Sequence, residues 1–216
     1  MNTAGYITQK VLFNSQDLKL EGILHSPPGK RCLPAVVVCH PHPQFGGSMD
    51  NNVVNSLCES LAEKSIIALK FNYRGTGQSQ GCFDEGRGEQ FDAKAAFEYL
   101  LSRPEVDACR AGLAGYSAGA AWGLPAVYKD TRVKALVGVS PPLGMLDFHF
   151  LTDCQKPCLL ISGSRDNLVN PDRLKTLSLS NPDFIQYSVI SEADHIWWKY
   201  EDILASRVAG FFTANL

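Results

Sequence analysis

A serine flanked by glycines is the feature of this sequence best suited to carry chemistry. It stands in Gly115-Tyr116-Ser117-Ala118-Gly119, after an apolar run typical of a strand and before a helical pattern. A serine at such a strand-to-helix turn is held clear of the sheet, where its hydroxyl can act as a nucleophile. The amide of Ala118 then becomes a candidate donor to an oxyanion. Because glycine-rich turns also occur as plain structure, the motif needs support from the rest of the chain.

A base and an acid follow in positions that suit the serine. Asp166 comes just after the apolar run 158–162, and His195 comes just after the run 184–190. If both runs are parallel strands, both residues lie at the sheet edge where ligands bind in open α/β sheets. A serine needs a base to remove its proton, and a carboxylate orients that base and stabilises its cation. We therefore expect Ser117, Asp166 and His195 to meet as nucleophile, acid and base.

Other acids are weaker candidates for the carboxylate. Asp194 is adjacent to His195, but sequence neighbours rarely point a side chain at each other's ring nitrogen. Asp172 falls at the start of an expected helix, where the helix dipole favours a carboxylate. Asp130 and Asp147 lie near other connections and do not follow the end of a strand. Asp166 is the prediction.

A second oxyanion donor is expected in the loop 40–48, after the apolar run 35–39. Pro41 and Pro43 have no amide hydrogen, so His42 is the first backbone candidate and Gln44 the next. His40 and His42 could also be read as two metal ligands, but no matching Cys, His or carboxylate set accompanies them. We therefore expect no metal, and we interpret His40 as a structural residue beneath the loop.

The sequence also indicates no organic cofactor. The segment 72–79 contains a G-x-G, but it lacks the third glycine and the helix start of a dinucleotide-binding fingerprint. We interpret this segment as a structural loop. The partner we expect is a small-molecule acyl substrate.

These residues require a framework of alternating strands and helices. A polar turn between residues 11–13 and 18–25 predicts an antiparallel hairpin. Pro125 is expected to kink or shorten the helix that begins near Ala118, and Asn170-Pro171 to start a short helix. The remaining strands are predicted at 35–39, 66–73, 111–116, 134–140, 157–162 and 184–190, and helices at 52–64, 88–101 and 196–212. The pattern predicts an α/β fold, with a mostly parallel sheet, an N-terminal antiparallel hairpin and helices on both faces.

Composition agrees with one ordinary globular domain over residues 1–216. The chain is 45% hydrophobic and 19% charged, with a net charge of −2 and no run of like charges. We therefore expect no nucleic-acid or membrane surface. Residues 1–9 lack the features of a secretory signal, and the seven cysteines form no paired framework. These features predict a cytoplasmic protein, and its oligomeric state is not indicated.

Taken together, the motifs resemble the α/β-hydrolase superfamily over essentially the full length, and more closely its small dienelactone-hydrolase-like group. The resemblance rests on residues 40–43 (HPHP), 46–51 (GGSMDN), 71–75 (FNYRG), Gly77, Ser79, Gly81, residues 88–89 (GE), Asp92, residues 95–96 (AA), the Ser117 motif, Gly163, Asp166 and residues 194–195 (DH). It implies Ser117 as nucleophile, Asp166 as acid and His195 as base. Dienelactone hydrolases carry cysteine at the position of Ser117, so that particular activity is not expected.

The function that follows is hydrolysis of a carboxylic ester or related acyl bond through an acyl-enzyme at Ser117. The same machinery attacks thioesters and small peptides, and a non-catalytic binding protein on the same fold is the alternative from another class. Only residues 141–156 separate two strands where larger relatives insert a cap, so a minimal lid is expected. Phe148, Phe150, Trp197 and Trp198 could line a substrate pocket or belong to the core.

Overall fold

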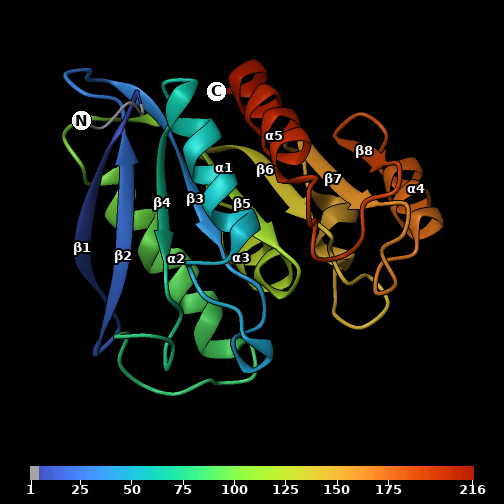
Figure 1. Ribbon diagram of the computed structural model, residues 1–216, viewed down its shortest axis with the longest axis horizontal. Helices are drawn as coiled ribbons and strands as arrows, with labels where there is room; N and C mark the ends of the chain where they lie inside the picture. Colours follow the sequence, from blue (N-terminus) through green and yellow to red (C-terminus); the bar gives the residue numbers. More distant parts are fainter. Residues whose placement is uncertain (1–4) are drawn as a thin grey trace.

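The apolar runs of the sequence build one eight-stranded sheet in the computed structural model, which describes residues 5–216 (Figure 1). The strands are β1 (Ile7–Ser15), β2 (Leu18–Ser26), β3 (Leu33–Cys39), β4 (Ile67–Phe71), β5 (Val106–Tyr116), β6 (Val133–Val139), β7 (Cys158–Gly163) and β8 (Ile185–Ile190). Their order is β1-β2-β4-β3-β5-β6-β7-β8. The hairpin β1–β2 is antiparallel and joins β4 antiparallel, whereas all other neighbours pair in parallel.

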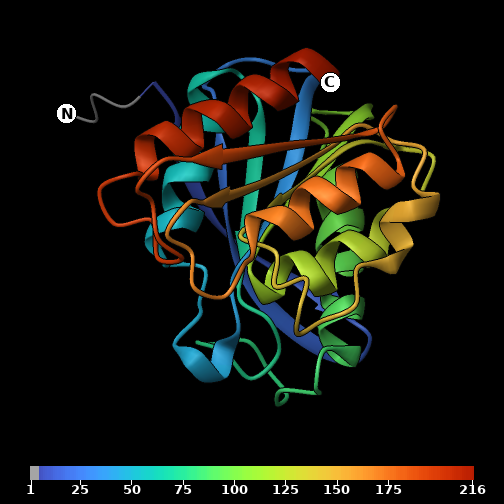
Figure 2. The same ribbon diagram turned by 90° about the vertical axis from the view of Figure 1, so that its right-hand side faces the viewer.

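Helices cover both faces of this sheet (Figure 2). They are α1 (Asn52–Glu63), α2 (Arg87–Leu101), α3 (Ala118–Val127), α4 (Pro171–Ser180) and α5 (Glu201–Asn215), with two 3₁₀ turns, η1 (Pro43–Phe45) and η2 (His149–Asp153). The buried side chains of α1 and α5 belong to one apolar cluster, and those of α2, α3 and α4 belong to a second cluster. The predicted fold class is therefore confirmed. The single domain stays a prediction, and its residues 1–4 lie outside the described residues.

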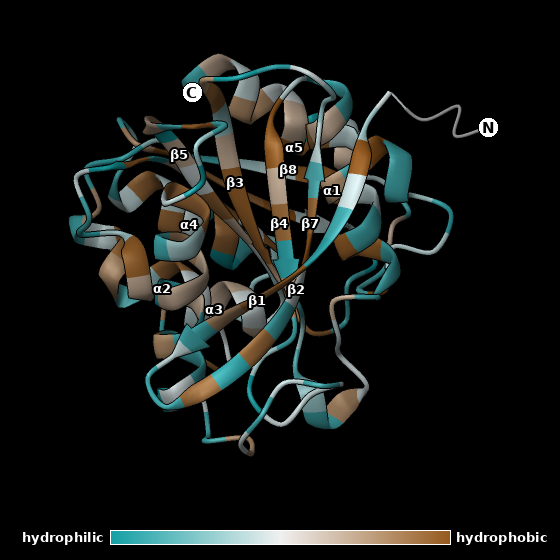
Figure 3. Cartoon of the chain, turned by 90° about the vertical axis from the view of Figure 1, so that its left-hand side faces the viewer, coloured by the Kyte–Doolittle hydropathy of each residue, from teal (hydrophilic) through white to brown (hydrophobic). Residues whose placement is uncertain are grey.

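The central strands are apolar on both sides because helices cover both faces. All five residues of β4 are buried, and so are the last five of β3. Most residues of both strands are hydrophobic, which Figure 3 draws in brown. The edge strand β8 buries only Ile185 fully. Helix α1 begins where the Asn51 side chain accepts the Val53 amide. It buries one apolar face, made of Val53, Val54, Leu57, Cys58, Leu61 and Ala62. Because β3, β5, β6, β7 and β8 pair in parallel, their carboxyl ends lie on one edge of the sheet.

The prediction of the last helix was wrong at its start. A helix was expected from residue 196, whereas α5 begins at Glu201. The carboxylate of Asp194 accepts the amides of Ile196 and Trp197, and Trp197 and Lys199 have positive φ angles. The apolar residues there continue the helical pattern, but their backbone forms a loop, because Asp194 offers the amides an alternative to helical hydrogen bonds.

Two other helix predictions fared differently. Helix α3 continues through Pro125 to Val127, so the proline lies inside the helix, and a kink or shortening caused by it stays a prediction. Asn170 caps α4 by accepting the amide of Asp172, with Pro171 at the first helical position.

Candidate active site

Ser117 occupies the turn between β5 and α3. Its φ of 54° is a conformation that a serine keeps only where the surrounding structure holds it. Its amide donates to the Val139 carbonyl on β6 at 2.8 Å, which fixes the turn against the sheet. A Cβ at Gly119 would lie 2.4 Å from the His40 carbonyl oxygen, and one at Gly115 would lie 2.5 Å from the backbone of α3. Both glycines of the motif are therefore required by close backbone approach.

The structure brings the three residues singled out from the sequence into contact. The Nε2 atom of His195 lies 3.2 Å from Ser117 Oγ. Its Nδ1 atom lies 2.9 Å from each carboxylate oxygen of Asp166. Because an ionised carboxylate can only accept, Nδ1 carries the hydrogen, and Nε2 is left to accept the serine proton. Residues from three separate connections thus form a continuous path from carboxylate to hydroxyl.

The Asp166 carboxylate is buried but well supplied with donors. Its side chain is fully covered, and its Oδ1 accepts the amides of Leu168 at 3.0 Å and Val169 at 3.1 Å. Burial by itself raises the pKa of Asp166, but hydrogen bonds from His195 and Ser140 outweigh it and lower the pKa below the usual value. The carboxylate therefore stays ionised at neutral pH.

The loop that carries His195 is fixed from two sides. The carboxylate of Asp194, the weaker candidate for the acid, accepts the amides of Ile196 and Trp197, whereas the ring contacts Asp166. On the other side, the Tyr116 hydroxyl donates to the carbonyl oxygen of His195 at 2.6 Å. The ring is thus aimed by its own loop as well as by Asp166.

Two backbone amides are free to receive a developing negative charge. Within residues 5–216, neither the Ala118 amide nor the His42 amide donates to a protein acceptor. The Gln44 amide, the other candidate, already donates to the His42 ring Nδ1 at 3.3 Å. The loop of His42 lies against the nucleophile turn, because Gly119 packs directly on the His40 carbonyl. The Ala118 and His42 amides therefore remain the predicted pair of donors.

Comparison with known proteins identifies relatives that share this fold. The chain is similar to the solved structure of an α/β serine hydrolase homologue from Coxiella burnetii, with 30% identity and a TM-score of 0.85. The likeness covers 94% of this chain and 96% of that one. The chain belongs to the α/β serine hydrolase family.

Two curated relatives extend the comparison for this hydrolase. Uncharacterized protein RP471 from Rickettsia prowazekii is 33% identical over 196 residues, covering 87% of this chain and 82% of the relative. Thiohydrolase apmlB from Arthrinium phaeospermum is 34% identical over 139 residues, covering 62% of this chain and 43% of the relative. A scan against models of known protein families found no match.

An aromatic group beside the serine turn was missed by the sequence reasoning. The His42 ring contacts Phe45, Phe83 and Trp122, with ring centroids 4.9, 4.9 and 5.1 Å away. We call these four residues the aromatic wall. Trp122 lies on α3 one turn after Ala118, and Phe45 is 87% exposed. No periodicity joins three segments so far apart, so only the tertiary structure of the hydrolase reveals the wall.

The aromatic residues named from the sequence divide between core and surface. Trp197 is fully buried in the core, and Phe148 is buried as well. The rings of Phe150 and Tyr128 pack together with their centroids 5.0 Å apart, whereas Trp198 is exposed. The segment that holds Phe148 and Phe150 joins β6 to β7 and contains only the short turn η2.

His40 has a structural part in the hydrolase, as expected. It is buried, its Nε2 accepts the Tyr73 amide at 3.1 Å, and its Nδ1 lies 2.6 Å from the Pro41 carbonyl oxygen. Burial lowers the pKa of His40 to about 4, so the ring is neutral. Among residues 5–216, no three or more His, Cys, Asp or Glu side chains gather in a way that could hold a metal ion.

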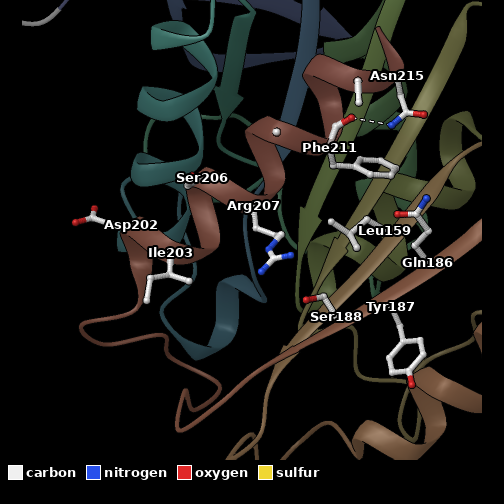
Figure 4. A pocket seen from close by; sticks show the side chains of 12 residues that line it. Leu159, Gln186, Tyr187, Ser188, Asp202, Ile203, Ser206, Arg207, Phe211 and Asn215 are labelled. Atoms are coloured by element: carbon white, nitrogen blue, oxygen red, sulfur yellow. Dashed lines mark hydrogen bonds between the residues drawn. The ribbon is translucent and has the colours of Figure 1, made fainter.

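Two hollows in the surface lie away from Ser117. One of about 840 Å³ opens between α5 and the strands β7 and β8, with Arg207 and Phe211 on its helix side and Ser188 on its strand side (Figure 4). A smaller hollow of about 450 Å³ borders Asp166 and is lined by residues 166–171 with Gly144 and Arg173. Neither is lined by Ser117 or His195. Among the helices that the structure describes, none has the length and apolarity needed to cross a membrane.

Proposed function

We propose that this protein hydrolyses a carboxylic ester, or a related acyl bond, through an acyl-enzyme at Ser117. The observation that carries the proposal is the path from Asp166 through His195 to Ser117, with contacts of 2.9 and 3.2 Å. A serine hydroxyl becomes nucleophilic when such a base accepts its proton, and the carboxylate stabilises the cation that the base becomes.

The residues then act in order. His195 Nε2 takes the hydroxyl proton while Ser117 Oγ attacks the substrate carbonyl carbon. The oxyanion that forms is met by the amides of Ala118 and His42, which are free to donate. His195 returns its proton to the departing alcohol and leaves an acyl group on Ser117. A water molecule, deprotonated by His195, then releases the acid and restores the serine.

The substrate is a small acyl compound with an apolar group beside its carbonyl. The aromatic wall supports this, because it joins the His42 loop to the helix that begins next to Ser117, and its exposed Phe45 offers contact area to an apolar group. The narrower likeness to the dienelactone-hydrolase-like group is part of the proposal and rests on the sequence motifs. A cytoplasmic location is also proposed, and the seven free cysteines support it.

A thioester is the second candidate substrate. The observation that favours it is the likeness to a thiohydrolase over 62% of this chain. The same nucleophile and donors attack a thioester carbonyl, so rates with paired oxygen and sulfur esters of one acyl group decide between the two.

Labelling by a fluorophosphonate tests the proposal. The native protein should be modified at Ser117, whereas Ser117→Ala and heat-denatured protein should not be labelled. A panel of p-nitrophenyl esters of increasing acyl length, run beside the matching thioesters, should give turnover that Ser117→Ala abolishes. A folded protein that is neither labelled nor active would favour the non-catalytic binding role.

A further inference from the structure

Strand β8 forms one edge of the sheet, so only one side of its backbone is paired within the chain. The carbonyls of Phe184 and Ile190, at the two ends of this strand, each accept an amide from the β7 side at 2.8 Å. Because the backbone groups of a strand point alternately to its two sides, the even-numbered residues between them face β7 as well. The N–H and C=O groups of Tyr187 and Val189 therefore face outwards, where the described residues supply no further strand.

This edge has none of the features that usually protect an open strand. Native proteins guard such edges with charged residues, prolines or bulges. Strand β8 has the sequence IQYSVI, which contains no charge and no proline, and its pairing with β7 has no bulge. Tyr187 is 42% exposed and Val189 is 37% exposed. The opposite edge strand, β1, carries Lys10 near its middle. Of the two edges, β8 is therefore the better suited to pair with another strand.

A second β8 strand matches this edge when the two run antiparallel about Tyr187. With a two-fold axis at that residue, Tyr187 of each copy exchanges two backbone hydrogen bonds with Tyr187 of the other. The outward amide of Val189 in each copy then donates to the carbonyl of Ile185 in the other. In this register Gln186 lies opposite Ser188, and Ile185 lies opposite Val189. Polar side chains thus meet polar ones, and apolar side chains meet apolar ones.

Charge and shape also favour the antiparallel arrangement. Glu192, just beyond the strand, is already paired with Arg165. Asp183, just before the strand, is exposed. Antiparallel pairing keeps the two Asp183 side chains at opposite ends of the interface, whereas parallel pairing would bring these like charges together. Helix α5 stands back from the edge and leaves the hollow of about 840 Å³ that Gln186 and Ser188 line (Figure 4), so it does not block the approach of a second strand.

We propose that the β8 edge is the docking surface for a second copy of this chain, and that two copies join their sheets through antiparallel β8 strands. The product is a two-fold dimer in which the eight strands of each copy form one continuous sheet. This association does not depend on the reaction proposed at Ser117.

Light scattering coupled to size-exclusion chromatography, over protein concentrations from micromolar to sub-millimolar, tests the dimer. The native protein should reach twice the 23.6 kDa of one chain and should dissociate on dilution. Val189→Lys puts a charge on the edge, and Tyr187→Pro removes the central outward N–H without touching a bond to β7. Leu12→Lys is the matched control, because Leu12 is 66% exposed on the other edge strand, β1. Far-ultraviolet circular dichroism should show that each variant is folded.

We expect Val189→Lys to raise the dimer Kd about 10-fold or more, because each copy replaces an apolar cross-strand contact by a charge. Tyr187→Pro removes two of the shared hydrogen bonds and should raise Kd about 30-fold. Leu12→Lys should keep the native Kd. In hydrogen exchange followed by NMR, the Tyr187 amide should exchange at least about 10-fold more slowly in the native protein than in Val189→Lys.

The inference is overturned if the native protein keeps the mass of one chain at every concentration. It also fails if folded Val189→Lys is as dimeric as the native protein, or if the Tyr187 amide exchanges equally fast in both. Dissociation by Leu12→Lys but not by Val189→Lys would assign the interface to β1 instead. If Tyr187→Pro does not fold, Val189→Lys and the exchange of the Tyr187 amide still decide the question.

Discussion

The hydroxyl of Tyr116 donates a hydrogen bond to the carbonyl oxygen of His195 at 2.6 Å, across 79 residues of sequence. Tyr116 immediately precedes Ser117, so the residue that leads into the nucleophile turn also holds the loop of the base. The buried phenol has a pKa raised above its usual value, chiefly by burial and also by the Asp166 carboxylate, and it therefore remains a donor. Nucleophile and base are coupled through this contact as well as through their own side chains.

Tyr116→Phe should therefore weaken catalysis without abolishing it. Loss of one neutral hydrogen bond is worth about 1 kcal/mol, which predicts kcat lower by about 5-fold, with KM little changed. Steady-state kinetics with a p-nitrophenyl ester measures this. Tyr187→Phe, on the exposed edge strand β8, is the control and should match the native protein. Equal kcat for the two variants would mean that the contact does not aim His195.

Asp166→Asn should lower kcat by roughly three to four powers of ten. The amide cannot stabilise the imidazolium, and its NH2 group favours the wrong histidine tautomer. Asp194→Asn is the matched control: it keeps the side-chain oxygen that accepts two amides, so its rate should lie near that of the native protein. The opposite ranking of the two variants would assign the acid role to Asp194.

Gly119→Ala should destabilise the fold, because its Cβ would lie 2.4 Å from the His40 carbonyl oxygen and neither backbone can yield freely. We expect the free energy of unfolding to fall by about 2 kcal/mol or more. Gly210→Ala on α5 meets nothing within 4 Å and should raise it by about 0.5–1 kcal/mol through helix propensity. Urea unfolding measures both. A stable Gly119→Ala variant would contradict the close approach of the loop to the turn.

His25 should make stability depend on pH. It is buried on β2, both ring nitrogens lack partners among the described residues, and burial together with Lys70 lowers its pKa to about 4. The unfolded chain takes up this proton below about pH 6.5, whereas the folded protein does not until about pH 4. The stabilisation is therefore complete above pH 6.5 and is lost as the pH falls towards 4, by at most about 3 kcal/mol.

Urea unfolding of the native protein and His25→Phe at several pH values tests this sign. The variant lacks the titrating ring, so its free energy of unfolding should fall less between pH 7 and 4. Parallel curves for the two proteins would show that His25 is protonated equally in the folded and unfolded states.

Much of the framework could be predicted because it depends on local chemistry. Apolar runs such as that of β3 must be covered on both faces, and Asn170 with Pro171 starts α4 by its own hydrogen bond and fixed φ. The same reasoning predicted that Ser117, Asp166 and His195 come together, because the ends of parallel strands share one edge. The roles of these residues in catalysis, like that of the His42 amide, stay predictions until the kinetics are measured.

The sequence by itself determined the succession of strands and helices along the chain, the glycines of the nucleophile turn, and the chain order of serine, acid and base. Only the tertiary structure decided that α5 starts five residues late, that Trp197 is buried under Ser140, and that three aromatic rings meet the His42 ring. Periodicity and turn chemistry act between residues near in sequence, and so they can be recognised in the chain. Trp197 and Ser140 are 57 residues apart, and their contact depends on how loops pack after the sheet has formed.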